Sequence, residues 1–481
     1  MTLDIRTVVA TAALVALVGV GTASAQVAEG AAAPTTAASP LRLTLDQAVA
    51  RGLEVGEEVA AAQLQRDLAD SQVTQARSGA LPQVSAQIGY NRTLASVFDA
   101  VGQGLFGGDE GGGGDDGGDG GDNPFASLPF GRRNTWNATI SISQALYSGG
   151  RVGAGLDIAR EVRRAAELEL EEARADLAHQ IRTAYFEAVL ANELVAIAEE
   201  AHRLATEQVE HVELLRQQGT ASDFDVLRAA VDRDNLEPNV VQARNGRRVA
   251  ELNLKRLINV PADQPLELVT PLEPRIADID RSALRAALAS RPALEALDAV
   301  VAARDRAIDV VKADRLPTIN AVGVFGQQAF PDGVSPFGTD WRRDWAVGLQ
   351  ASIPIFDGLR TAGRIDQAEA ELRQAELQRD QARQAIELEF EAALGEFDAA
   401  RSQIEARRAT VEQAERALEL AELRFANGLA TQLDVSNARL MHEQARVNEA
   451  QALFSYVSAL ARLERVTGGT VPLLAERLQG D

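Results

Sequence analysis

Histidine is the residue type in this chain with the widest chemical use, and its four copies are too far apart to share a metal ion. They are His179, His202, His211 and His442, all within stretches of helical pattern. None has a second histidine three or four positions away, the spacing that puts two ligands on one helix face. The nearest ligand pair, His211 and Glu213, points to different faces. The sequence therefore predicts no metal site and no cofactor.

The sequence contains no recognisable catalytic motif. No phosphate-binding glycine loop follows a strand pattern, and no strand-to-helix nucleophile turn is present. We therefore predict that the protein is not an enzyme.

The tract 107–122 combines glycines with six acidic residues and is the second candidate for chemistry. A glycine-aspartate calcium coil needs a regular nonapeptide spacing with an apolar residue in each repeat. No apolar residue lies between Asp109 and Asp122. Such a tract cannot bury enough apolar surface to offset its ordering entropy. It therefore predicts a mobile, solvent-facing hairpin loop.

This acidic tract separates two parallel halves. The motif QGTASDFDV recurs as NGLATQLDV, so Gly219 corresponds to Gly428 and Asp225 to Asp434. The separation between these pairs is constant from the long helices to the ends of the copies. One unit is therefore duplicated, and the first copy carries the inserted loop.

Composition favours long helices over a thick core. Aromatic residues make up only 4% of the 481 residues, while alanine, glutamate, leucine and arginine are abundant. The net charge of −22 makes nucleic acid an unsuitable partner. The absence of cysteine excludes disulfides, thiolate metal sites and a lipidated N-terminal cysteine.

Residues 1–25 have the pattern of a secretory signal peptide, and 26–43 that of an unstructured tether. The apolar run 8–20 is followed by Ala-Ser-Ala at 23–25. An uncleaved anchor is the alternative, but so short a run is poorly suited to span a bilayer. No other stretch approaches a transmembrane helix, so any further membrane insertion must use strands.

Four segments alternate apolar with small or polar residues, the pattern of half-exposed strands. They cover about 83–93, 135–146, 318–327 and 344–353. Their length suits transmembrane strands, and aromatic residues gather near their ends. A small soluble β-domain is the alternative, but large residues are too few to make its core. Four strands cannot close a barrel, so the chain must oligomerise.

The remaining pattern is helical. The first repeat (44–259) has predicted helices at 44–80, 151–217 and 222–258, and the second (281–467) at 281–314, 359–426 and 431–466. A proline-rich linker (260–280) joins the repeats, and a tail (468–481) follows them. Two heptad seams run along the first long helix, which implies a neighbour on each side, as in the wall of a tube. Two short helices end to end match each long one.

Each long helix ends at a glycine, and an acidic first turn follows. Gly219 is followed by the predicted N-cap Ser222 and by Asp225, and Gly428 is followed by Asp434. The helix dipole favours an acid at this place by about 0.3–1 kcal/mol. Capping alone is therefore a sufficient reason for both aspartates.

The order of parts and the two paired motifs resemble the TolC-like outer-membrane efflux proteins over nearly the whole mature chain. Besides the tip motifs, SIPIFDGLR at 352–360 and QALYSGGR at 144–151 carry the resemblance. It implies a mainly α fold with a membrane β-barrel. Three chains would close a twelve-stranded outer-membrane barrel, continued by an α-helical periplasmic tunnel. The tract 107–122 would then be extracellular.

The implied function is the gated, passive exit duct of a tripartite efflux pump or a type I secretion system. Its partners would be two further copies, outer-membrane lipids, a periplasmic adaptor (membrane fusion) protein and, through it, an inner-membrane transporter. The tip turns Gly219-Thr220 and Gly428-Leu429 resemble the family's adaptor-docking turns.

The resemblance also implies a periplasmic gate at Asp225 and Asp434, with Asp434 in the family's acidic ring. Like charges repeated around a ring would raise the carboxylate pKa. This chain departs from the best-known pattern, because Asn437 replaces a second gate aspartate and Ala430 and Phe425 replace a locking arginine and tyrosine.

A secreted or periplasmic coiled-coil structural or adhesive protein, without a pore, is the alternative from another class. It would be recovered from the soluble periplasm, whereas the channel would form heat-modifiable trimers in outer membranes.

Overall fold

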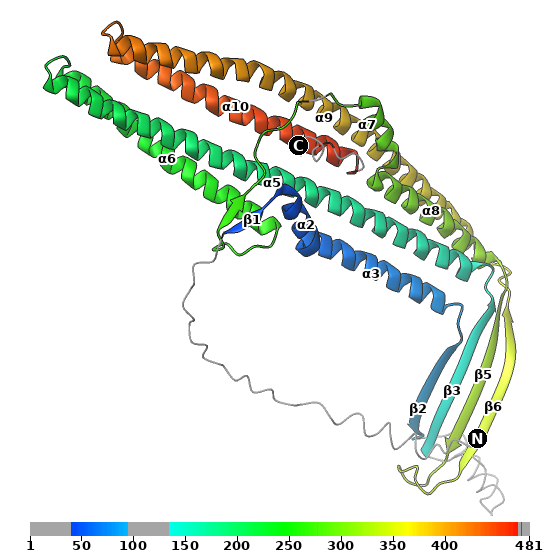
Figure 1. Ribbon diagram of the computed structural model, residues 1–481. Coiled ribbons are helices and arrows are strands. Elements are labelled where there is room, and N and C mark those ends of the chain that lie inside the picture. The colour runs from blue at the N-terminus through cyan, green and yellow to red at the C-terminus, as the bar shows by residue number, and fades with distance from the viewer. Residues whose placement is uncertain (1–39, 95–133, 277, 470–472, 474–481) are drawn as a thin grey trace, which may run out of the picture.

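The computed structural model describes residues 40–94, 134–276, 278–469 and 473 of an elongated molecule. Long helices make up most of its length, and a four-stranded sheet forms one end (Figure 1). The predicted signal peptide (1–25) and the acidic tract (107–122) lie outside the described residues. Among the described helices, none is both long and apolar enough to cross a membrane.

Two helices of 67 residues, α5 (Arg151–Gln217) and α9 (Arg360–Ala426), run most of the length of the helical part. At 1.5 Å per residue, each spans roughly 100 Å. The helices α3 (Glu57–Ser78) and α6 (Asp223–Leu257) pack along α5, and α8 (Pro292–Lys312) and α10 (Gln432–Val466) pack along α9. Because α8 and α10 also contact α5, it has neighbours on more than one side. The prediction that two short helices match each long one is confirmed.

The sheet is antiparallel throughout, in the order β2-β3-β5-β6. Its strands are β2 (Gln83–Arg92), β3 (Asn134–Tyr147), β5 (Thr318–Ala329) and β6 (Trp341–Ser352). The hairpin of each repeat therefore lies beside that of the other. β2 and β6 are left as edges with unpaired backbone groups, which isolated proteins seldom tolerate in long strands.

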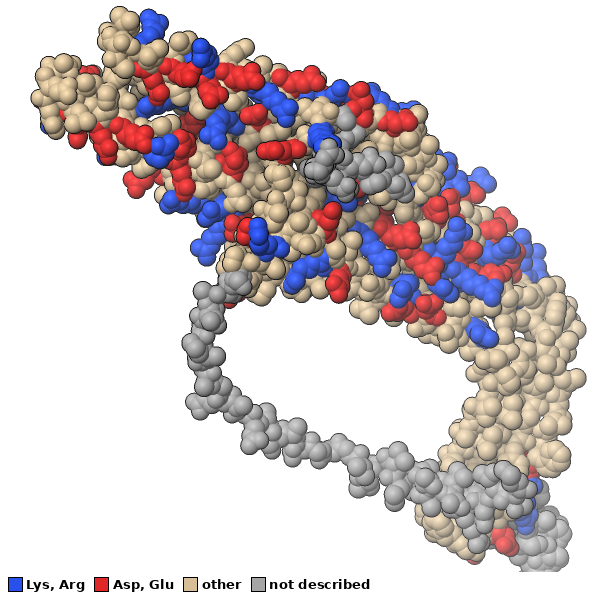
Figure 2. Space-filling model, in the orientation of Figure 1, with Lys and Arg blue, Asp and Glu red and all other residues tan. Residues whose placement is uncertain are grey.

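The sheet has one apolar and one polar face. Cross-strand register places Ile140, Phe325 and Trp345 in one row. On the other face, the Ser85 and Ser141 hydroxyls share a hydrogen bond of 2.7 Å. The charged residues of the four strands are Arg92, Arg342, Arg343 and Asp344, all at the end remote from the helices. Figure 2 shows the result on one face, as an uncharged band between the charged helices and that far end.

The prediction of one helix over 44–80 is wrong, because the chain breaks at Gly56 into α2 (Leu45–Val55) and α3. Gly56 is extended, and a Cβ there would lie 2.5 Å from both the Leu177 side chain and the Gly52 carbonyl oxygen. The close approach to α5 therefore requires glycine, and the extended backbone redirects the chain.

The tether (26–43) and linker (260–280) were predicted without regular structure, and each contains a short strand. β1 (Leu41–Leu43) and β4 (Leu266–Leu268) pair in parallel. The Tyr185 hydroxyl fixes them to α5, since it donates to the Leu43 carbonyl at 3.0 Å and accepts from the Thr270 N–H at 2.9 Å. The pairing joins segments more than two hundred residues apart, which periodicity cannot reveal.

The predicted helix 281–314 is also interrupted. It consists of α7 (Arg281–Ala287), the 3₁₀ turn η2 (Leu288–Ser290), α8 and a closing turn, η3 (Ala313–Arg315). Pro292 has no N–H to donate and disfavours a helical conformation at Arg291, so the helix restarts there. The tail is not wholly separate either, because Leu473 is buried in the main core.

A buried charge network joins four helices next to this core. Arg291, 3% exposed, donates to Glu172 of α5 at 2.7 Å and to Glu389 of α9 at 3.0 Å. Arg465 of α10 bonds Glu389 as well, and donates to Asp176 of α5 at 2.6 Å. The network fixes the start of α8 against three other helices.

We predict that Arg291→Met lowers the free energy of unfolding by about 3–5 kcal/mol, because it breaks a buried ion-pair network and leaves Glu172 without its partner and Glu389 with Arg465 alone. Arg304→Met is the matched control, since Arg304 of α8 pairs with Glu371 of α9 at an exposed site. Its loss should cost no more than about 1 kcal/mol. Thermal unfolding followed by circular dichroism would measure both, and equal losses would contradict the prediction.

Candidate functional site at the helical tips

The two helical hairpins, α5–α6 and α9–α10, turn at the end of the molecule remote from the sheet (Figure 1). At the first turn, Gly219 has a φ of +76°, a left-handed conformation that glycine adopts without strain. The Gly219 N–H donates to the Arg216 carbonyl and the Thr220 N–H to the Leu215 carbonyl, both at 2.9 Å. This is a Schellman motif, and it satisfies the last carbonyls of α5.

The second turn repeats the first. Gly428 has a φ of +67° and donates to the Phe425 carbonyl at 2.9 Å, while the Leu429 N–H donates to Arg424 at 2.8 Å. The two turns, which repeat each other in sequence, therefore also have the same hydrogen-bond pattern. Leu429 is 71% exposed, so the turn presents an apolar side chain to solvent.

Both aspartates of the predicted gate complete capping boxes. Asp225 accepts from the Ser222 hydroxyl at 2.6 Å and from the Ser222 N–H at 2.9 Å. Asp434 accepts in the same way from Thr431, at 2.7 and 2.8 Å. In return, each hydroxyl accepts from the aspartate's own N–H. The structure thus shows the capping role, and the gate role stays a prediction.

Capping has an electrostatic consequence. The hydroxyl and backbone hydrogen bonds lower the pKa of Asp225 and of Asp434 below the ordinary aspartate value. Within one protomer this direction is opposite to the rise expected from a ring of like charges. Both carboxylates are therefore ionised at neutral pH.

The structure shows the neighbours of the three residues that depart from the family pattern, Phe425, Ala430 and Asn437. The Phe425 ring of α9 lies edge-on to His211 of α5, with 6.2 Å between the ring centroids. This contact joins the two hairpins near their tips. Ala430 is half-buried, and Asn437 lines a cavity between the hairpins.

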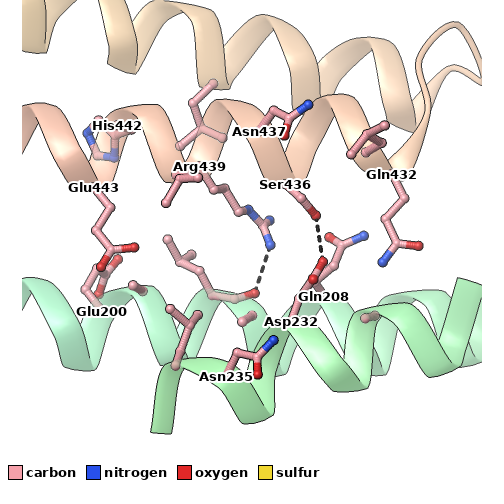
Figure 3. Close-up of a pocket in the computed structure, with 18 of the residues that line it drawn as sticks. Glu200, Gln208, Asp232, Asn235, Gln432, Ser436, Asn437, Arg439, His442 and Glu443 are labelled. Atoms are coloured by element: carbon pink, nitrogen blue, oxygen red, sulfur yellow. Dashed lines mark hydrogen bonds between the residues drawn. The ribbon is translucent and has the colours of Figure 1, made fainter. Parts of the chain in front are cut away.

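Further contacts between the hairpins were missed by the sequence reasoning. The Ser436 hydroxyl donates to Asp232 of α6 at 3.0 Å, and Arg439 Nη1 donates to the Leu204 carbonyl of α5 at 3.0 Å (Figure 3). Arg439 also pairs with Glu422 of α9 at 2.8 Å. No sequence signal marks these residues, because a helical serine or arginine has the same local pattern whether or not a partner faces it.

Three of the histidines, His179, His202 and His211, lie on α5, and His442 lies on α10. In the described part of the chain, no group of three or more metal-ligating side chains could hold an ion. Burial lowers the pKa of His179 below the ordinary histidine value. His211 packs against an aromatic ring, as described above.

A sequence model described as "outer membrane efflux protein" matches residues 53–260 and 283–469, which include most of both repeats. Among curated proteins, CyaE of Bordetella pertussis is 28% identical over 246 residues, 49% of this chain and 50% of CyaE. The cobalt-zinc-cadmium resistance protein CzcC of Cupriavidus metallidurans is 26% identical over 254 residues, 51% of this chain and 55% of CzcC. The matched part therefore spans about half the length of these curated relatives.

The fold also resembles solved structures. The CmeC outer membrane channel of Campylobacter jejuni superimposes with a TM-score of 0.70 at 17% identity. The match covers 91% of this chain and 87% of CmeC. At this identity the likeness concerns the fold, a helical tunnel with a β-barrel, as the sequence predicted.

We predict that Gly428→Ala destabilises the α9–α10 turn by about 1–2 kcal/mol, because alanine in the left-handed region is strained. Gly395→Ala is the matched control within the same helix. Its Cβ would meet nothing within 4 Å, and alanine should stabilise the helix there by about 0.5–1 kcal/mol. Hydrogen exchange of the amides flanking each site would measure both, and the same sign for both changes would be the contrary result.

We also predict that the start of α10 is stable near neutral pH and loosens only in acid. Because the folded-state pKa of Asp434 is lowered, its stabilisation is present above the ordinary aspartate value. It is lost as the pH falls through the folded-state value. Hydrogen exchange in the first turn of α10, corrected for intrinsic rates, should show this profile. Asp434→Asn should exchange faster at neutral pH with no acid step, and an unchanged acid step would contradict the assignment.

Proposed function

Because this chain belongs to the outer membrane efflux protein family, we propose that it is the passive exit duct of a tripartite efflux pump or a type I secretion system. Family membership places it in the outer membrane, with the helical portion in the periplasm. Its relatives are channel proteins rather than enzymes. A duct needs no cofactor, and the energy for export comes from its partners.

The observation that carries this proposal is the sheet. It combines an uncharged band, one apolar face and two unpaired edges. Strands of 10 to 14 residues are long enough to cross a bilayer. On the apolar face of the edge strand β6, Trp345 is 74% exposed and Val347 79% exposed, which suits lipid rather than water.

Three copies resolve the problem of the two edges. When β6 of one chain pairs with β2 of the next, three four-stranded sheets close into a barrel of twelve strands, and no edge is left. The polar face, with Ser85 and Ser141, then lines the interior. The helices continue the wall away from the membrane, because all four strands connect to helices at the same end.

The tips take the role of contacts to other proteins. We infer that the turns Gly219-Thr220 and Gly428-Leu429 dock a periplasmic adaptor protein, which connects the duct to an inner-membrane transporter. The two turns have the same backbone geometry, so one kind of partner can bind both. Exposed apolar side chains beside them, such as Phe224 and Leu429, supply the contact surface.

Asp225 and Asp434 form the periplasmic gate in this proposal. Both are ionised and lie in the first turn after a tip. In a trimer each recurs three times, and gathered carboxylates attract cations and repel anions. The capping hydrogen bonds hold each carboxylate beside its helix start, so the ring has a fixed position.

The alternative of a secreted coiled-coil protein without a pore accounts for the helices alone. It gives no reason for an exposed apolar sheet face or for the family match. Cell fractionation distinguishes the duct from the coiled-coil protein without a pore. The duct requires heat-modifiable trimers in detergent extracts of outer membranes, and recovery as a soluble periplasmic protein would reject it.

Adaptor docking can be tested because the chain has no cysteine of its own. Ala221→Cys or Ala430→Cys, placed beside the two turns, would carry a crosslinker in living cells. The proposal expects capture of a periplasmic adaptor from both positions. The control is Glu412→Cys, at an exposed position in the middle of α9. Docking at the tips would be rejected if neither tip position captured an adaptor, or captured no more of it than Glu412→Cys does.

The gate makes a separate prediction for single-channel recordings in planar bilayers. Asp434→Ala should reduce cation selectivity and weaken block by multivalent cations added on the periplasmic side, with trimer stability little changed. The control is Asp223→Ala, which removes an exposed acid at the α5–α6 tip, two residues from Asp225 and outside its capping box. If the Asp225→Ala, Asp434→Ala double variant kept its cation selectivity and its block by multivalent cations, the gate role would be rejected. Helix capping would then be the only role of the two aspartates.

A further inference from the structure

A partly open cavity lies between the two hairpins of one protomer, a short distance from their tips. Its volume is about 410 Å³, within the range of small-molecule sites. All four helices of the hairpins contribute to its wall. Leu204, Leu236 and Leu440 are among the side chains of its apolar middle.

One end of the cavity is acidic. Glu443 of α10 and Glu200 of α5 point toward one another across it (Figure 3). Glu200 pairs with Arg203, whereas Glu443 has no ion pair among the described residues. Arg446, one turn further along α10, is engaged by Glu193 at 3.1 Å. Of the other arginines in the lining, Arg439 pairs with Glu422, and Arg228 lies near Asp225. The carboxylate of Glu443 thus faces the cavity without an ion-pair partner.

Burial is the cause of a raised pKa at Glu443, and no cation offsets it. Half-buried carboxylates are costly unless a positive group accompanies them. A cation placed at this end of the cavity would remove that cost.

The other end of the cavity contains amides without partners. Gln432 is only 7% exposed, and both its Oε1 and its Nε2 are buried without a hydrogen bond. Gln208 Nε2, across the cavity on α5, is in the same state. A buried amide without a hydrogen-bond partner destabilises the fold, and apolar residues would fill this place without that cost. The pair therefore suits a ligand that both donates and accepts hydrogen bonds.

We propose that this cavity binds a flat or elongated organic cation. Its positive charge lies between Glu200 and Glu443, its apolar body lies among the leucines, and its polar end bonds Gln208 and Gln432. Because the ligand touches both hairpins, it opposes their separation. It acts beside the existing links, Ser436 to Asp232 and Arg439 to the Leu204 carbonyl. The site is thus a place at which a small molecule stabilises one arrangement of the tips.

Ethidium is a suitable probe of the charge and shape of the site, since it is a flat aromatic monocation. Its amino groups can donate to Gln432 Oε1. Isothermal titration of the purified full chain should show one saturable site per chain. Glu443→Gln should weaken binding about tenfold or more, because the attraction between the ring cation and the carboxylate is lost. Glu412→Gln, which neutralises an exposed acid outside the cavity, should leave binding unchanged. Absence of saturable binding, or equal affinity in Glu443→Gln, would overturn the proposal.

Two further variants locate the site without altering charge. Ala201→Phe fills the cavity from α5 and should abolish binding while circular dichroism shows the helices intact. Gln432→Leu should raise the melting temperature of the free protein, since it removes a buried unpartnered amide, and yet weaken ethidium binding about threefold or more. Normal binding in Ala201→Phe would place the site elsewhere.

The sign of the charge has its own control. The anionic dye 8-anilinonaphthalene-1-sulfonate has a similar size, and it should not compete with ethidium for the site. Competition at equal affinity would show that the cavity selects for apolar surface alone and would overturn the cation assignment. These titrations use the isolated chain, so their outcome does not depend on whether the duct transports cargo.

Discussion

The stability of this elongated molecule depends on one junction, where α5, α8, α9 and α10 meet. Away from it, the helices touch largely through alanine, which buries little surface. At the junction, Tyr185, Phe186, Phe390, Phe397 and Tyr456 are almost completely buried. The Phe397 and Tyr456 ring centroids are 5.4 Å apart, and the Arg291 network lies close by. The scarce aromatic residues are therefore concentrated where α5, α9 and α10 can share them.

Both ends of the molecule contrast with this junction. The sheet leaves its apolar face and two edges exposed, and the tips expose Phe224 and Leu429. A single chain cannot satisfy either surface. The middle of the molecule therefore buries its apolar surface within one chain, whereas its two ends do not, as the proposed duct requires.

Duplication gives the two tips the same local geometry in different surroundings. Each has a Schellman turn followed by a capping box. The hairpins nevertheless contribute different side chains to the space between them, since Asp232 and Leu204 come from the first repeat and Ser436, Arg439 and Glu443 from the second. The repeated part sets where the chain turns, and the part that differs sets how the hairpins interact.

The sequence by itself determined what depends on neighbouring residues. Glycine at 219 and 428, Ser222 and the period-two alternation around Trp136 act within a few positions, so the turns, the caps, the strands and the long helices were predictable. The order of parts was also sufficient to identify the family.

The tertiary structure decided what depends on partners distant in the sequence. Position 56 requires glycine because Leu177 leaves no room for a side chain, and β1 is a strand because β4 lies beside it. The Leu45 N–H donates to Thr270, 225 residues away. The cavity beside Glu443 likewise exists only because two hairpins face each other. Helical periodicity tells which residues share a face, but it does not tell which residue of another helix meets them, because packing selects the partner through shape and charge.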